Sequence, residues 1–101
     1  MHKNLSYKII VNPTSGRGNG SRSVLQIENL LIEYGLNFEI VQTEYPWHAA
    51  ELAQEAAAEG FDVVIAAGGD GTVNEVINGL MIAKGDHTNR PALGVLSRWA
   101  R

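Results

Sequence analysis

The most constraining feature of the sequence is the apolar segment from Phe61 to Ala67, which runs directly into Gly68-Gly69-Asp70-Gly71. Only Asp62 interrupts the apolar residues, so a strand formed here would be covered on both faces. Such strands are typical of parallel sheets that carry helices on either side. The segment therefore predicts a central strand of a parallel α/β sheet.

Three further segments have the length and composition of strands. Tyr7 to Val11 is rich in β-branched residues and stops at Asn12-Pro13, because proline disfavours a helix at the preceding residue and lacks a backbone donor. Asn37 to Thr43 alternates as a strand covered partly on both faces would. Leu93 to Leu96 has the length and content of a fourth, short strand.

Two helices are predicted between the first three strands. Trp47 to Glu59 is dominated by alanine, the best helix former, and Gly60 stands at its expected end. The earlier helix ends before Gly35, where a left-handed cap is expected. Its apolar positions recur at helical spacing and are Val24, Ile27, Leu30, Leu31 and Tyr34.

A third helix is predicted from Thr72 to about Ala83, with Thr72 and Glu75 spaced as in a capping box. Strands and helices then alternate along the chain, and the connections are long enough for right-handed crossovers. We therefore expect one domain, residues 1–101, in which helices cover both faces of an open parallel sheet.

Composition excludes several classes of protein. The net charge of −3 provides no basic field for a nucleic acid backbone, so nucleic acid is not an expected partner. The chain has no cysteine, which fits a reducing compartment, and we expect a cytoplasmic location. The longest apolar run, Val63 to Ala67, is far too short to span a membrane, so contact with lipid would be peripheral.

Two glycine-rich loops follow predicted strands, Asn12 to Gly20 and Gly68 to Thr72. In open parallel sheets, ligands bind outside the carboxyl ends of the strands, where these loops would lie. Neither loop matches a Walker A or dinucleotide pattern. Their glycines nevertheless allow backbone N–H groups to converge on an anion, and the helix that starts near Thr72 adds its positive end. The loops predict phosphate binding.

Asp70 stands in the middle of the second loop, although a carboxylate repels a phosphate unless a cation or a hydroxyl donor lies between them. Mg²⁺ resolves this conflict, since it usually takes one or two carboxylates together with phosphate oxygens and water. The loop therefore points to a Mg²⁺-nucleotide and to phosphoryl transfer.

The segments VNPTSGRG and AAGGDGTVNEVINGL resemble the diacylglycerol kinase catalytic domain, a family that includes bacterial lipid kinases. The Gly-Gly-Asp-Gly core is also similar to that of NAD kinases and phosphofructokinases, but Asn74, Glu75, Asn78 and Gly79 favour lipid kinases. The segment TEYPWHAAELAQEAA extends the resemblance to roughly residues 7–96. It implies the Rossmann-like N-terminal lobe that NAD kinases and diacylglycerol kinases share.

The resemblance implies that ATP and Mg²⁺ bind here and that the γ-phosphate passes to a lipid hydroxyl, such as that of diacylglycerol. Asp70 is then the catalytic and Mg²⁺-placing residue. The implied ATP contacts are Asn12, Pro13, Thr14, Ser15, Gly16, Thr43, Gly69, Asp70, Gly71, Thr72, Val73, Asn74 and Glu75.

The sequence departs from the family pattern in two places. Trp47 stands where the family commonly has glycine, and Ser97 to Arg101 replaces a Gly-Thr-x-Asn-Asp loop that completes the nucleotide site. The β-rich second domain, which in the family supplies the catalytic base and much of the lipid site, is absent as well. We therefore expect a fragment that is inactive by itself, with exposed strand edges that favour a homodimer.

Two other interpretations of the glycine-rich core stay open. A NAD kinase-like fragment, or a non-catalytic interaction module that has kept only the fold, would carry the same glycine-rich core. Among the remaining polar and aromatic residues, His48 suits packing better than catalysis. For Phe38, Tyr45 and Trp47, core or interface packing is expected rather than stacking on a base.

Overall fold

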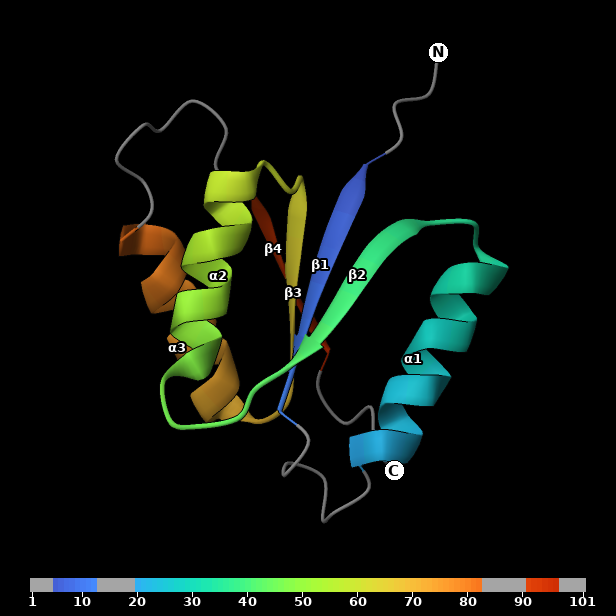
Figure 1. Cartoon of the computed structure of the whole chain (residues 1–101), viewed down its shortest axis with the longest axis horizontal. Helices are drawn as coiled ribbons and strands as arrows, with labels where there is room; N and C mark the ends of the chain where they lie inside the picture. Colours follow the sequence, from blue (N-terminus) through green and yellow to red (C-terminus); the bar gives the residue numbers. More distant parts are fainter. Residues whose placement is uncertain (1–4, 13–19, 83–90, 97–101) are drawn as a thin grey trace.

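Strands and helices alternate along the chain in the computed structural model, which describes residues 5–12, 20–82 and 91–96 (Figure 1). The alternation confirms the predicted order of elements. Within the described residues the elements are β1 (Ser6–Val11), α1 (Gly20–Glu33), β2 (Asn37–Gln42), α2 (His48–Glu59), β3 (Val63–Ala67), α3 (Asp70–Ile82) and β4 (Ala92–Leu96).

The strands form one parallel sheet in the order β2-β1-β3-β4. Helix α1 lies on one face of this sheet, while α2 and α3 lie side by side on the other (Figure 1). The chain moves outward from β1 to β2 and then crosses back over β1 to reach β3, so right-handed crossovers place the helices on opposite faces. The predicted three-layer α/β architecture is confirmed.

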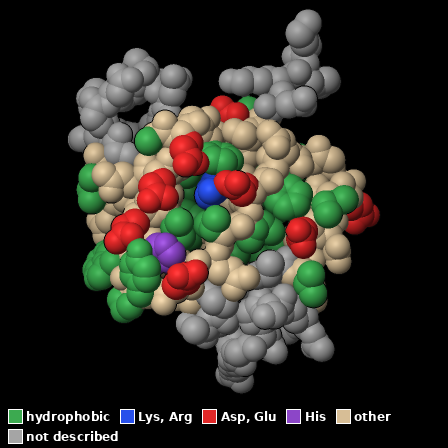
Figure 2. Space-filling view, in the orientation of Figure 1, with side chains coloured by type: hydrophobic (Ala, Val, Ile, Leu, Met, Phe, Trp, Pro, Cys, Tyr) green, Lys and Arg blue, Asp and Glu red, His purple; other side chains and the backbone are tan. Residues whose placement is uncertain are grey.

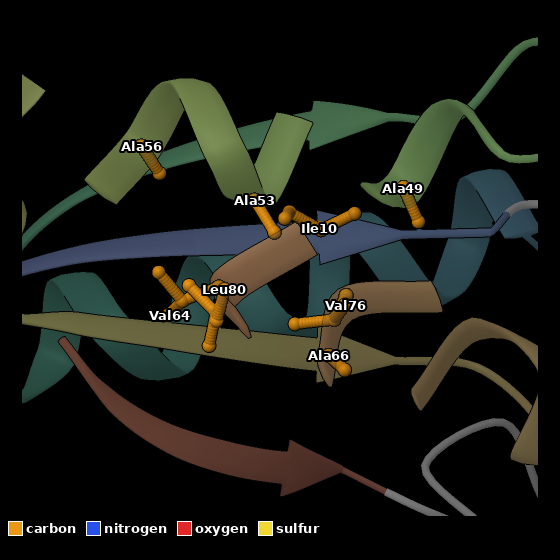
Figure 3. Packing of buried hydrophobic residues seen from close by; sticks show 8 residues of the cluster. All are labelled: Ile10, Ala49, Ala53, Ala56, Val64, Ala66, Val76 and Leu80. Atoms are coloured by element: carbon orange, nitrogen blue, oxygen red, sulfur yellow. The ribbon is translucent and has the colours of Figure 1, made fainter. Parts of the chain in front are cut away.

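Small residues let α2 and α3 pack closely on one face of the sheet. Buried alanines of α2, among them Ala53, meet Ile10 of β1, Val64 of β3 and Leu80 of α3 (Figure 3). Gly79 of α3 lies directly against the α2 backbone: a Cβ there would overlap with the carbonyl group of Ala50, with its carbon only 2.9 Å away. This face therefore holds the tighter of the two cores.

The other face has a thinner cover. Ile27 and Leu31 of α1 are buried against Ile9 and Val11 of β1. Two other apolar residues at the helical spacing are not covered: Leu30 is 49% exposed and Tyr34 is 68% exposed. Helix α1 contacts the sheet mainly at the edge strand β2.

The ends of the helices test the predicted caps. Gly35 and Gly60 adopt positive φ angles of 70° and 88°, as the predicted left-handed caps require. The capping box of Thr72 and Glu75 was wrong: α3 begins at Asp70, because the Val73 N–H already donates to the Gly69 carbonyl at 3.2 Å. The amino-terminal loop from 13 to 19 lies outside the described residues.

Two charged residues of the sheet have structural partners. Asp62, the polar interruption before β3, accepts hydrogen bonds through Oδ2 from the Ser6 N–H at 2.9 Å and from the Ser6 hydroxyl at 3.2 Å. Lys8 is only 8% exposed, and its ammonium pairs with Glu39 and lies 5.1 Å from the centre of the Phe61 ring. Both residues fix the amino-terminal edge of the sheet. No helix in the described part of the chain is long and apolar enough to cross a membrane.

Candidate functional site

The candidate site lies at the carboxyl ends of the strands, where the sheet order reverses between β1 and β3. The chain leaves β1 toward β2 on one side and leaves β3 toward β4 on the other, which opens a crevice between the first turns of the connections. Backbone hydrogen bonds join the three strand ends: Asn12 N–H donates to Ala67 at 3.0 Å, and Thr43 N–H donates to Val11 at 2.8 Å. The two glycine-rich loops, which follow β1 and β3, therefore start beside each other.

A cavity of about 310 Å³ occupies this position. Four of the residues predicted from the resemblance meet around it, although they come from three separate segments of the chain. Of the described residues, those that line it are Asn12, Thr43, Glu44, Tyr45, Pro46, Thr72 and Glu75.

Gly68 lies close to Thr72 and to Asn12, the residue after β1. A Cβ at this position would lie 2.7 Å from the Thr72 hydroxyl oxygen and 3.3 Å from the Asn12 Cβ. Both distances are shorter than ordinary van der Waals contact, so only glycine lets the three residues come together. The glycine thereby lets Asn12 and Thr72, which both line the cavity, lie close together.

The first turn of α3 is open to solvent. Asp70 and Gly71 are exposed, and among the described residues no atom lies within 4 Å of a Cβ placed on Gly71. The first N–H groups of a helix have no partner inside it, and they carry the positive end of the helix dipole. This turn can therefore receive an anion.

Other predicted residues take different places. Thr72 is buried and Asn74 is exposed, while the Val73 side chain packs against the core, so that only its backbone is left for a ligand. Gly69 is exposed beside Asp70. The predicted contacts Pro13, Thr14, Ser15 and Gly16 lie outside the described residues.

The sequence interpretation included Thr43 but missed the part of the wall that Glu44, Tyr45 and Pro46 provide. Tyr45 was expected to pack in a core or interface, but it is 48% exposed and lines the cavity. Trp47 is 55% exposed and has a φ of 68°, a conformation that suits glycine. The sequence analysis noted that the family commonly has glycine at this position but predicted no positive φ there.

Two contacts hold Tyr45 beside the cavity. Its hydroxyl donates to the Glu51 carboxylate at 2.6 Å, and its ring stacks on the His48 ring with centroids 4.1 Å apart. The hydrogen bond to Glu51 raises the pKa of Tyr45 above its ordinary value, and nearby negative charges add to this shift. The shift thus favours the protonated phenol, the form that donates to Glu51.

The charge around the site is acidic. Glu44 and Glu75 both line the cavity, and acidic side chains are spread over the face of the molecule seen in Figure 2, where the described residues show little basic surface. An anion in this cavity would be repelled by the two carboxylates unless it brought a cation with it. The electrostatics favour a metal-bound anion over a bare one.

Comparison with known proteins gives the family. Residues 6–98 match the diacylglycerol kinase catalytic domain. A diacylglycerol kinase of Bacillus subtilis (strain 168) is 43% identical over 89 residues, which are 88% of this chain and 28% of that protein. Sphingoid long chain base kinase 5 of Saccharomyces cerevisiae is 38% identical over 79 residues, which are 77% of this chain and 12% of that protein.

A solved structure agrees with these similarities. A diacylglycerol kinase of Bacillus anthracis str. Sterne superposes with a TM-score of 0.76 at 30% identity, over 94% of this chain and 33% of that one. The chain thus spans about a third or less of the length of each of these relatives. The match over residues 6–98, together with these relatives, shows that the chain belongs to the diacylglycerol kinase catalytic domain family.

Proposed function

We propose that this chain is the ATP-binding part of a lipid kinase that transfers the γ-phosphate of ATP to a lipid hydroxyl, such as that of diacylglycerol. The observation that carries the proposal is the cavity between the ends of β1, β2 and β3, which adjoins the open first turn of α3. A nucleotide suits this arrangement, because its phosphates need an anion-binding helix end and its base needs the wall of a cavity.

The phosphates would lie against the backbone from Gly69 to Thr72. Exposed glycines and the helix end suit close approach by phosphate oxygens, and Pro13 to Gly16, which follow β1, would complete this cradle. The ribose and base would extend toward Thr43 and Glu44 at the end of β2, as they do in other doubly wound sheets.

Asp70 would hold the Mg²⁺ that accompanies ATP. In the ranges 5–12, 20–82 and 91–96 no three carboxylate, histidine or cysteine side chains gather around a point where they could bind a metal. One exposed carboxylate at the phosphate end of the cavity suits Mg²⁺ that takes its other ligands from phosphate oxygens and water. Such an ion would neutralise phosphate charge during transfer.

The remaining features of the function rest on the family and on composition. We infer that the 101-residue chain binds ATP but does not phosphorylate a lipid, since it spans only 28% of the Bacillus subtilis relative. We also propose that the chain is cytoplasmic and that it contacts a membrane only peripherally. We propose that it forms a homodimer and does not bind nucleic acid.

Calorimetric titration of the purified chain with ATP, with and without Mg²⁺, tests the proposal. We expect saturable binding that requires Mg²⁺ and that weakens about tenfold in Asp70→Asn, because loss of one metal-ligand charge costs on the order of 1.4 kcal/mol. Glu59→Gln, at an exposed position on α2 away from the cavity, is the matched control and should bind like the wild type.

Two results would contradict the proposal. A folded chain that binds no nucleotide would favour an interaction module that has kept only the fold. Tighter binding of NAD than of ATP would favour the NAD kinase-like alternative. Transfer of phosphate from ATP to diacylglycerol by the purified chain would overturn its predicted inactivity.

A further inference from the structure

Besides backbone hydrogen bonds, three side-chain contacts tie the segment between β2 and α2 to α2. The Glu44 N–H donates to His48 Nδ1 at 2.9 Å, and the Tyr45 hydroxyl donates to Glu51 at 2.6 Å. The Tyr45 ring also stacks on the His48 ring, with 4.1 Å between centroids and 15° between planes. His48 takes part in two of these contacts and joins the first turn of α2 to the segment before it.

These contacts hold in place a segment whose backbone is strained at Trp47. Trp47 immediately precedes α2 with a φ of 68°, and a residue with a side chain resists this left-handed conformation by about 1–2 kcal/mol. The Trp47 side chain makes no capping hydrogen bond with the first turn of α2. The path of the chain from Thr43 to Trp47 is therefore held by its contacts with α2 rather than by its local preference.

His48 acts from behind the wall of the cavity. Glu44, Tyr45 and Pro46 line the cavity, whereas His48 is absent from its described lining. Tyr45 thus has the imidazole on one side, and 48% of its surface stays exposed. An aromatic ring held in this way offers the flat apolar surface on which purine bases stack.

We propose that His48 is a positioning residue of the nucleotide site. It holds Glu44 and Tyr45 in place, so that the Tyr45 ring forms the surface against which the purine base packs. The inference rests on the proposed ATP site and adds to it the residue that sets the base-binding wall. The imidazole accepts at Nδ1, so the tautomer that performs this role carries its proton on Nε2.

Two variants separate the contacts of His48. His48→Asn keeps an acceptor, since its Oδ1 is as far along the side chain as Nδ1, but it lacks the ring. His48→Phe keeps a ring for Tyr45 but has no acceptor. Circular dichroism and thermal unfolding of each variant show that the fold is intact.

The first measurement needs no ligand. Amide hydrogen exchange at Glu44, followed by NMR, should be slow in the wild type and in His48→Asn. In His48→Phe it should be at least about fivefold faster, because its hydrogen bond is lost. Equal exchange rates in the wild type and His48→Phe would overturn the proposal, whether or not the chain binds ATP.

The second measurement compares Mg²⁺-ATP with inorganic tripolyphosphate in the presence of Mg²⁺. We expect His48→Phe to weaken ATP binding about 5- to 10-fold, because loss of the acceptor releases the Glu44 backbone that places Tyr45 in the cavity wall. Tripolyphosphate binding should be unchanged, since only ATP has a base to stack. His48→Asn should recover most of the loss. Equal weakening of both ligands would mean a general structural role and would overturn the inference. A wild-type chain that binds neither ligand would instead contradict the proposed ATP site.

Discussion

The two ends of α3 both contain glycine, but for opposite reasons. Gly79, in the carboxyl-terminal half, lies where any side chain would collide with the Ala50 carbonyl group of α2. Gly71, in the first turn, has no positive φ, and no atom of the described residues lies within 4 Å of a Cβ placed there. Close packing explains Gly79, but packing among the described residues does not explain Gly71. The difference teaches that one end of the helix is built for the core and that the other leaves its first turn open.

Gly79→Ala should produce the largest effect. The new Cβ would press on the α2 backbone, which cannot turn aside as a flexible side chain would, so α2 and α3 must separate. We expect the free energy of unfolding to fall by about 3 kcal/mol, at the upper end of the range for overpacked cores. Urea unfolding followed by far-UV circular dichroism measures this change.

Gly71→Ala is the matched test at the other end of the same helix. A fall in stability of less than about 0.5 kcal/mol in Gly79→Ala would mean that the helices are not closely packed there. A large fall in Gly71→Ala would likewise mean that the first turn is packed after all. Either result would remove the contrast between the two ends.

Gly71→Ala should separate stability from binding. Alanine is the better helix former, so we expect the free energy of unfolding to rise by about 0.5 kcal/mol. The Cβ would stand at the proposed path of the phosphates, so Mg²⁺-ATP affinity should fall about tenfold, a change of about 1.4 kcal/mol. Chemical unfolding and calorimetric titration of the same preparation measure the two quantities. Unchanged affinity would show that the space above Gly71 does not belong to the ligand.

Sequence reasoning predicted the fold well because its signals were local. The buried run before Gly68 and the left-handed caps at Gly35 and Gly60 each depend on a few neighbouring residues. The same reasoning placed the start of α3 two residues too late, because it weighed the Thr72 and Glu75 side chains over the Gly69 carbonyl.

The candidate site was harder to predict, since its residues meet only through the order of the strands. Asn12, Thr43 and Thr72 were predicted from the resemblance, and the reversal between β1 and β3 brings them to one cavity. Tyr45 was missed because an aromatic residue beside proline looks the same in sequence whether it packs inward or lines a wall. Its neighbours His48 and Glu51, both on α2, determine its position.

Trp47 extends the comparison to a position that has a side chain where glycine would fit. Its φ of 68° costs about 1–2 kcal/mol for a residue with a Cβ, whereas glycine adopts it freely. The ring is 55% exposed, so its removal leaves little cavity. We therefore expect Trp47→Gly to be about 1 kcal/mol more stable than Trp47→Ala, which loses the ring but keeps the Cβ.

The comparison between these two variants isolates backbone strain, because both lack the indole ring. Thermal and urea unfolding of the pair measure the difference in the free energy of unfolding. If Trp47→Ala were as stable as Trp47→Gly, then the left-handed turn would not be strained, and the contacts of His48 and Tyr45 would not be needed to hold it. A clear difference would mean that Trp47 keeps this segment under strain and that α2 restrains it, as the role inferred for His48 requires.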